Sequence, residues 1–123
     1  MIPRETSASI ELPVGRDDAW RALAGAARLT AEGVLHFEHT DVVLDSVTPG
    51  EAAGGDAHWE GLDFRVAVHL VPRAADQTLV LFTAEATEEP HGVRSTAHAS
   101  AAHRHVRQDL EAMASAVGLQ VTG

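Results

Sequence analysis

The sequence contains no cysteine, and that absence excludes several kinds of chemistry. Without thiols, the 123-residue chain has no disulfides, no thiolate nucleophile and no sulfur ligand for a metal ion. Long apolar runs are absent too: no stretch approaches the roughly 20 residues that a membrane-spanning helix needs. Residues 1–5 lack the apolar core of a signal peptide. We therefore expect no membrane span and a cytoplasmic location.

Positive charge is scarce. There are nine basic and 18 acidic residues, which gives a net charge of −9 with histidine counted as neutral. Such a surface repels a phosphate backbone, so the sequence predicts no nucleic-acid partner. The nucleophile elbow, the phosphate loop and the dinucleotide fingerprint are also missing. We expect no cofactor.

Aromatic residues are few (4%), but hydrophobic residues reach 45%, which is typical of a globular protein. A chain of this length has room for one hydrophobic core. No linker, internal repeat or low-complexity tract divides it. We expect residues 1–123 to form a single domain.

The first third of the chain predicts a strand, a helix and a second strand. Apolar and polar residues alternate over 6–14, which is the period of a half-buried strand. Residues 15–18 favour a helix start, because carboxylates in a first turn interact favourably with the helix dipole. Residues 35–47 are strand-like, and the apolar run 42–44 indicates a bulge or a segment covered on both faces. The apolar stripe expected on the helix comprises Trp20, Leu23, Ala24 and Ala27.

Glycines predict the breaks in the middle of the chain. Residues 48–50 and the pair Gly54–Gly55 are expected to bracket a turn. Trp59 departs by one position from the alternation that follows it. We expect Gly61 to form a bulge that restores the alternation.

Two strands with regular alternation follow. Residues 62–70 alternate strictly between apolar and polar, and residues 78–87 carry Val80, Phe82 and Ala84 on one face. The two segments are predicted to pair through a hairpin loop at 74–76. Pro72 is expected to end the first strand, because proline cannot donate to the ladder.

A long helix is predicted for Arg94 to Val117, with Ser95 as its N-cap and Gly118 as its stop. We expect this helix to cross the whole sheet. Its apolar face recurs every three or four positions and comprises Ala99, Ala102, Val106, Leu110, Met113 and Val117. The residues expected to face away from the sheet are Gln108, Asp109 and Glu111.

The segment 9–14, Ser-Ile-Glu-Leu-Pro-Val, is followed at 18–23 by Asp-Ala-Trp-Arg-Ala-Leu. With the order of the predicted elements, these segments resemble the START-like superfamily, which includes polyketide cyclases, the birch-pollen allergen family and heat-shock ATPase activator homologues. The resemblance covers nearly the whole chain. It implies an α+β helix-grip fold: an antiparallel sheet, a short N-terminal helix and a long C-terminal helix packed across the sheet. The chain is shorter than is usual for this group and is expected to lack one or two middle strands.

The resemblance also implies a function, the binding of a small hydrophobic molecule in an apolar pocket between sheet and helix. Two alternatives stay open: a cyclase-like or dehydratase-like enzyme that uses a pocket histidine or carboxylate, and a protein-interaction module or homodimer that docks through the sheet or the small-residue helix face. Taken singly, each apolar pocket candidate is also explained as core. The candidate pocket-lining residues are Phe37, Trp59, Phe64, Val66, Phe82, His98, Ala102 and Val106.

The eight histidines do not form a metal-binding motif. His105 and Asp109, four apart on the predicted helix, offer two ligands, and His58 and Glu60 on one side of a strand offer two more. His103 and His105 point about 200° away from each other on a helix. No three-ligand motif results, so we expect no metal site.

Four residues are candidates for general acid–base work: His69, Glu60, Glu85 and His98. His69 is expected to face solvent, because it lies opposite the apolar row of its strand. Glu60 lies beside the predicted bulge, where a side chain can be redirected, and burial there would suit it to proton transfer. The pattern assigns a catalytic role to none of them.

Overall fold

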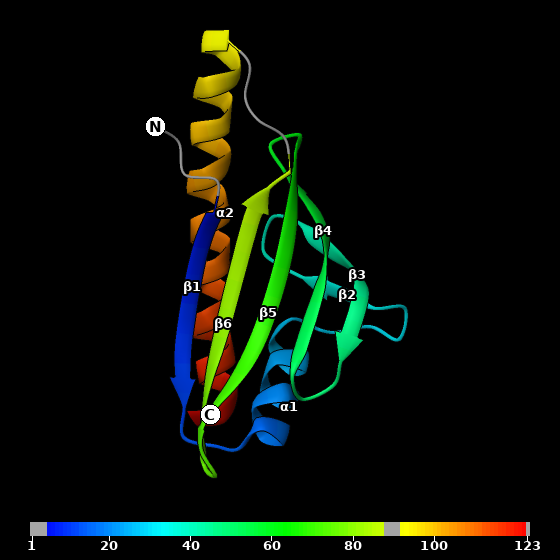
Figure 1. Ribbon diagram of the computed structural model, residues 1–123, viewed down its shortest axis with the longest axis vertical. Coiled ribbons are helices and arrows are strands. Elements are labelled where there is room, and N and C mark those ends of the chain that lie inside the picture. The colour runs from blue at the N-terminus through cyan, green and yellow to red at the C-terminus, as the bar shows by residue number, and fades with distance from the viewer. Residues whose placement is uncertain (1–4, 88–91, 123) are drawn as a thin grey trace.

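A computed structural model describes the backbone of residues 5–87 and 92–122, and the side chains of residues 5–87 and 100–121. One antiparallel sheet has the strand order β1-β6-β5-β4-β3-β2. Both helices pack on the same face of it (Figure 1). The elements are β1 (Glu5–Leu12), α1 (Arg16–Ala26), β2 (Val34–His36), β3 (Asp41–Thr48), β4 (Ala52–Trp59), β5 (Leu62–Ala74), β6 (Gln77–Ala86) and α2 (Gly92–Thr122).

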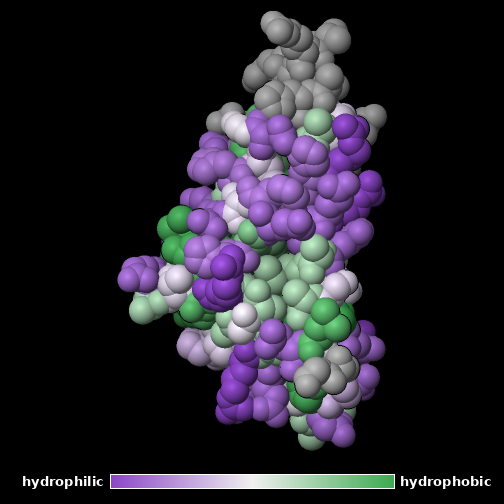
Figure 2. Space-filling model, turned by 180° about the vertical axis from the view of Figure 1, so that it is seen from behind, coloured by the Kyte–Doolittle hydropathy of each residue, from purple (hydrophilic) through white to green (hydrophobic). Residues whose placement is uncertain are grey.

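The predicted α+β architecture is confirmed: a six-stranded antiparallel sheet, a short N-terminal helix and a long C-terminal helix. In the part of the chain that is described, no helix is both long and apolar enough to cross a membrane. Seen from the helix side, a band of apolar residues runs across the middle of the molecule between two polar areas (Figure 2).

The N-terminal strand and helix follow their sequence pattern closely. Alternate residues of β1 turn inward and end on the buried Leu12. Helix α1 carries Asp17 and Asp18 in its first turn, as predicted. Its buried face differs from the predicted stripe, because Trp20 is only half-buried. The buried residues of this helix are Ala19, Ala22 and Leu23, and Ala27 follows directly after it.

Glycine was misinterpreted in the middle of the chain. Gly54 and Gly55 lie inside β4 rather than in a turn. A Cβ on Gly55 would lie 2.1 Å from the carbonyl oxygen of Val43 on β3, so glycine allows these two strands to approach closely. The turn itself occupies residues 49–51. The bulge predicted near 42–44 is confirmed by a register shift between Leu44 and Ser46.

Gly61 marks a chain reversal, not a bulge. Trp59 and Leu62 are cross-strand partners of β4 and β5, and the two residues between them, Glu60 and Gly61, have φ of 52° and 75°. Two successive positive φ values are typical of the tightest hairpin turns. The one-residue shift in parity therefore arises because Trp59 belongs to the preceding strand.

Strands β5 and β6 pair antiparallel as predicted, and their inward residues form the centre of the core. Strand β5 does not end at Pro72 but continues to Ala74, after a register shift. Residues 34–59 supply three strands, β2, β3 and β4, in the region where fewer were expected. The inward, buried residues are Phe64, Val66, Val68 and Leu70 on β5, and Val80, Phe82 and Ala84 on β6.

Helix α2 is longer at both ends than predicted. It begins at Gly92, so Ser95 lies inside it and is not its N-cap, and it continues through Gly118 to Thr122. At 1.5 Å per residue its 31 residues extend about 46 Å. The helix packs mainly on β1 and α1. Its predicted apolar face is confirmed by Ala102, Val106, Leu110, Met113 and Val117, none more than 6% exposed, whereas the side chain of Ala99 lies outside the described residues.

Candidate functional site

Seven of the eight predicted pocket-lining residues lie together in the hydrophobic core. Each is at most 5% exposed, and they come from β4, β5, β6, α2 and the loop after β2. The eighth, His98, has a side chain outside the described residues. The assignment of these residues to a pocket stays a prediction. The seven are Phe37, Trp59, Phe64, Val66, Phe82, Ala102 and Val106.

Phe37 occupies the middle of an aromatic cluster. Its ring meets Trp59 and Phe82 edge to face, with centroid distances of 6.3 and 6.2 Å, and Trp59 meets Phe64 in the same way at 5.5 Å. Edge-to-face contacts at this separation are favourable beyond the apolar area they bury. Phe37 belongs to residues 37–40, which connect β2 to β3 and which we call the hairpin tip. The hairpin tip therefore inserts an aromatic ring into the hydrophobic core.

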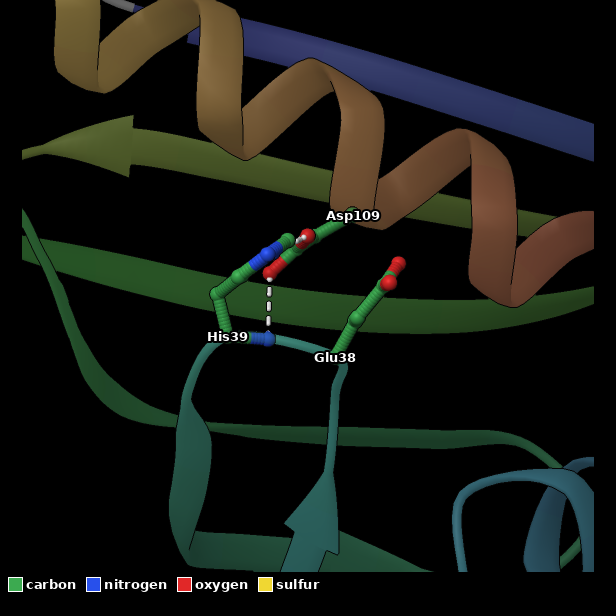
Figure 3. Close-up of side chains that lie close together, drawn as sticks. All are labelled: Glu38, His39 and Asp109. Carbon is green, nitrogen blue, oxygen red and sulfur yellow. Dashed lines mark hydrogen bonds and ion pairs between the residues drawn. The ribbon is translucent and has the colours of Figure 1, made fainter.

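Asp109 on α2 is the main correction to the sequence analysis. It was expected to face away from the sheet, but it is 1% exposed. Its Oδ2 accepts hydrogen bonds from Nε1 of Trp59 at 2.9 Å and from the backbone N–H of His39 at 3.0 Å. Its Oδ1 lies 2.6 Å from Nδ1 of His39. One carboxylate thus joins helix α2, the end of β4 and the hairpin tip. Figure 3 shows its contact with the hairpin tip.

This geometry fixes the chemistry of His39. A carboxylate only accepts hydrogen bonds, so Nδ1 carries a proton and Nε2 has the free lone pair when the ring is neutral. The hydrogen bond that His39 donates to Asp109 raises the pKa of His39, and the charges of Asp109, Glu38 and Glu60 act in the same direction, whereas burial acts against them. The side chain of His39 is 57% exposed, whereas that of Asp109 is fully buried.

A second carboxylate–histidine pair lies beside the first. Nδ1 of His105 is 2.5 Å from Oε1 of Glu60, and the His105 ring stacks on that of His39 with 6.2 Å between centroids. The ligand pairs expected from the sequence are therefore exchanged: Asp109 bonds His39 rather than His105, and Glu60 bonds His105 rather than pairing with His58. His58 contacts Asp63 across the β4–β5 hairpin.

Three of these residues form a set that the sequence did not predict. Glu38, His39 and Asp109 each place a potential ligand atom within 4.8 Å of the others. Figure 3 shows the first two reaching from the hairpin tip toward Asp109 on α2. The sequence contained no signal for this grouping, because 70 residues separate His39 from Asp109.

Of the four acid–base candidates, only Glu60 is seen to lie at this site. His69 is exposed, as predicted, and Glu85 and Glu60 are exposed as well. His103, which was not a candidate, is 9% exposed, and burial lowers its pKa. Its ring meets Phe64 edge to face at 5.3 Å, and its Nδ1 is 3.3 Å from Oγ1 of Thr6.

A hollow lies outside this region. It has a volume of about 600 Å³ and is lined by residues 13–18, which lead from β1 into α1, and by Ala75 and Asp76 of the β5–β6 turn. None of the predicted pocket-lining residues contributes to it.

No protein-family model matches the sequence, and no curated protein matches it. Several solved structures, however, have a similar fold. CalU16 from Micromonospora echinospora is 15% identical with a TM-score of 0.69, over 96% of this chain and 76% of CalU16. The Zhui aromatase/cyclase from Streptomyces sp. R1128 is 12% identical with a TM-score of 0.64, over 97% of this chain and 93% of Zhui.

The di-domain ARO/CYC BexL from the BE-7585A biosynthetic pathway is also 12% identical, with a TM-score of 0.67. This chain is covered to 98% but spans only 47% of BexL, about half of the di-domain. At identities this low the likeness concerns the fold. The chain has the helix-grip fold that the sequence resemblance predicted.

Proposed function

We propose that the protein binds a small apolar molecule between the sheet and helix α2, with access beneath the hairpin tip. The observation that carries this proposal is the position of Phe37. Its ring is 5% exposed, lies against Trp59 and Phe82, and is presented by a loop rather than by the sheet or a helix. An apolar ligand that displaced this ring would occupy a site already lined by aromatic side chains.

The fold supports the proposal. Its similarity to the aromatase/cyclases Zhui and BexL extends over nearly the whole of this chain, so the same elements surround the interior. The inward face of β4 carries only small residues before Trp59, namely Ala53, Gly55 and Ala57. Small apolar ligands bind in concave, mostly apolar sites with a few polar groups. Here Asp109 and His39 supply polar groups at the edge.

The hairpin tip is suited to admit a ligand. Strand β2 has only three residues, and in the described sheet it pairs on one side only, with β3. Polar contacts fasten the tip to α2 through the bonds between Asp109 and His39. A short edge strand opens at lower free energy than the centre of a sheet. On this proposal the tip swings outward as a unit when a ligand enters, carrying Phe37 with it.

A fluorescence titration with N-phenyl-1-naphthylamine tests the proposal. We expect saturable binding with one probe per chain, confirmed by native mass spectrometry. Phe37→Ala removes the competing ring and is expected to increase affinity several-fold, whereas Ala57→Leu adds bulk to the inward face of β4 and is expected to decrease it. Val43→Ala, at a residue 60% exposed, is the matched control and leaves binding unchanged. Absence of saturable binding to both the wild type and folded Phe37→Ala would contradict the proposal.

A second candidate function, an acid–base enzyme of the cyclase or dehydratase kind, is favoured by the pair formed by Asp109 and His39. The buried carboxylate orients the ring and leaves Nε2 able to accept a proton. In a dehydration, Nε2 would remove the proton α to a carbonyl and return it to the departing β-hydroxyl as water leaves.

The test is a β-hydroxyketone whose enone product absorbs in the near ultraviolet. We expect His39→Gln to lose the dehydration rate and His69→Gln, at an exposed position on β5, to retain it. Equal rates for wild type and His39→Gln would exclude this role for the pair.

A further inference from the structure

We propose that Glu38, His39 and Asp109 bind a divalent transition-metal ion of the zinc class. The proposal goes beyond apolar ligand binding and does not depend on it. It rests on three ligand atoms, one from each residue, that lie within 4.8 Å of one another. Two carboxylates and one imidazole are ordinary ligands for zinc, cobalt and nickel.

The buried ligand is already oriented. Trp59 Nε1 and the backbone N–H of His39 both donate to Oδ2 of Asp109, which holds the carboxylate plane in place. Oδ1 lies 2.6 Å from Nδ1 of His39, and the side chain of Glu38 lies beside the pair (Figure 3). Metal-binding carboxylates are commonly held by such outer hydrogen bonds, which reduce the cost of arranging the ligands.

The local charge favours a cation. Glu38 and Asp109 contribute two carboxylates, and Glu60 adds a third nearby that acts on His39. A divalent ion would offset the repulsion between the two ligating carboxylates. The nitrogen ligand selects the ion class, because magnesium and calcium prefer sites made of oxygen alone.

Binding exchanges one interaction for another. The ion takes the place of the proton between Nδ1 of His39 and Oδ1 of Asp109, and that proton passes to solvent. Three protein ligands leave a fourth position for water, open to solvent because Glu38 and His39 are exposed. The ion would also tie the hairpin tip to α2 more firmly than the hydrogen bonds alone.

The test uses the full chain without a histidine tag, treated with a chelator and dialysed. Zinc chloride is titrated by calorimetry, and cobalt chloride by its visible absorption spectrum. We expect one ion per chain and an increase of several degrees in the melting temperature. His39→Ala and Glu38→Gln are expected to weaken zinc binding at least 10-fold. His69→Ala is the control and keeps wild-type affinity.

Glu38→Gln keeps the test decisive, because Glu38 is exposed and its substitution removes a ligand without disturbing the core. A wild-type chain without a one-to-one site would overturn the proposal. So would Glu38→Gln and His39→Ala variants that bind zinc as the wild type does, because the ion would then lie on other histidines. Titrating the apolar probe separately distinguishes failure of this site from failure of the apolar site.

Discussion

Asp109 and Leu110 are neighbours on helix α2, and both are almost completely buried, at 1% and 0% exposure. Leu110 belongs to the apolar seam, by which we mean the continuous hydrophobic core between the helices and the sheet. Asp109 belongs to the polar edge, by which we mean the residues around its carboxylate: Glu38, His39, Trp59, Glu60 and His105. The same helix is thus held in two different ways within one turn.

The two kinds of contact differ in how strictly they require partners at a fixed direction. An apolar side chain gains roughly 1.5–3 kcal/mol from burial whatever its exact neighbours, so the apolar seam tolerates many sequences of similar volume. A buried carboxylate is stable only if donors point at it. At the polar edge, two N–H groups and an imidazole meet one carboxylate, and each comes from a place fixed by the fold. The apolar seam therefore accounts for stability, and the polar edge fixes where the hairpin tip lies.

The largest effect is expected from a charge in the apolar seam. Leu110→Asp would bury a carboxylate with no donor, so we expect the domain to lose several kcal/mol and to be unfolded at room temperature. Circular dichroism during thermal melting measures this. Gln108→Asp, the same new charge at an exposed position two residues earlier, is expected to melt close to the wild type. A well-folded Leu110→Asp variant would mean that α2 is not docked through this residue.

A smaller loss is expected at the polar edge. Asp109→Ala leaves the buried Nε1 of Trp59 without its acceptor, which costs about 1–3 kcal/mol. Urea denaturation followed by tryptophan fluorescence measures the free energy of unfolding. Glu111→Ala removes an exposed carboxylate from the same helix and is expected to change it little. If both variants were equally stable, the hydrogen bonds of Asp109 would contribute nothing to the fold.

The apolar seam could be predicted from the sequence, and the polar edge could not. Leu110 was found because apolar residues recur every three or four positions, which is a local pattern. The same rule places Asp109 about 100° away, among residues that normally face water. What buries Asp109 is the hairpin tip, 70 residues distant in the chain. Its partners could be known only after the sheet was assembled.

The glycines show the same limit of prediction from the sequence. Gly55 and Gly118 were both interpreted as breaks, but both lie inside regular elements. A Cβ on Gly118 would lie 2.5 Å from Cδ1 of Ile10, so this glycine lets α2 approach β1. From the sequence alone, a glycine that permits close packing is indistinguishable from one that ends an element. Gly50 and Gly61, both at positive φ, do lie in turns.

The smallest expected effect is a pH dependence of the unfolding free energy, and it concerns a histidine that packs against the apolar seam. Burial lowers the pKa of His103, whose ring lies against Phe64. The unfolded chain takes up this proton near pH 6.5 and the folded chain only at lower pH, so the contribution of His103 to stability is complete above pH 6.5 and is lost as the pH falls through the folded pKa. We expect unfolding free energies from urea titrations to fall less between pH 7.5 and 5.5 in His103→Gln than in the wild type. His69→Gln, at an exposed histidine, is expected to follow the wild type. Parallel curves for His103→Gln and wild type would mean that the apolar seam accepts a charged imidazole, and that the contrast between apolar seam and polar edge is weaker than the burial of His103 implies.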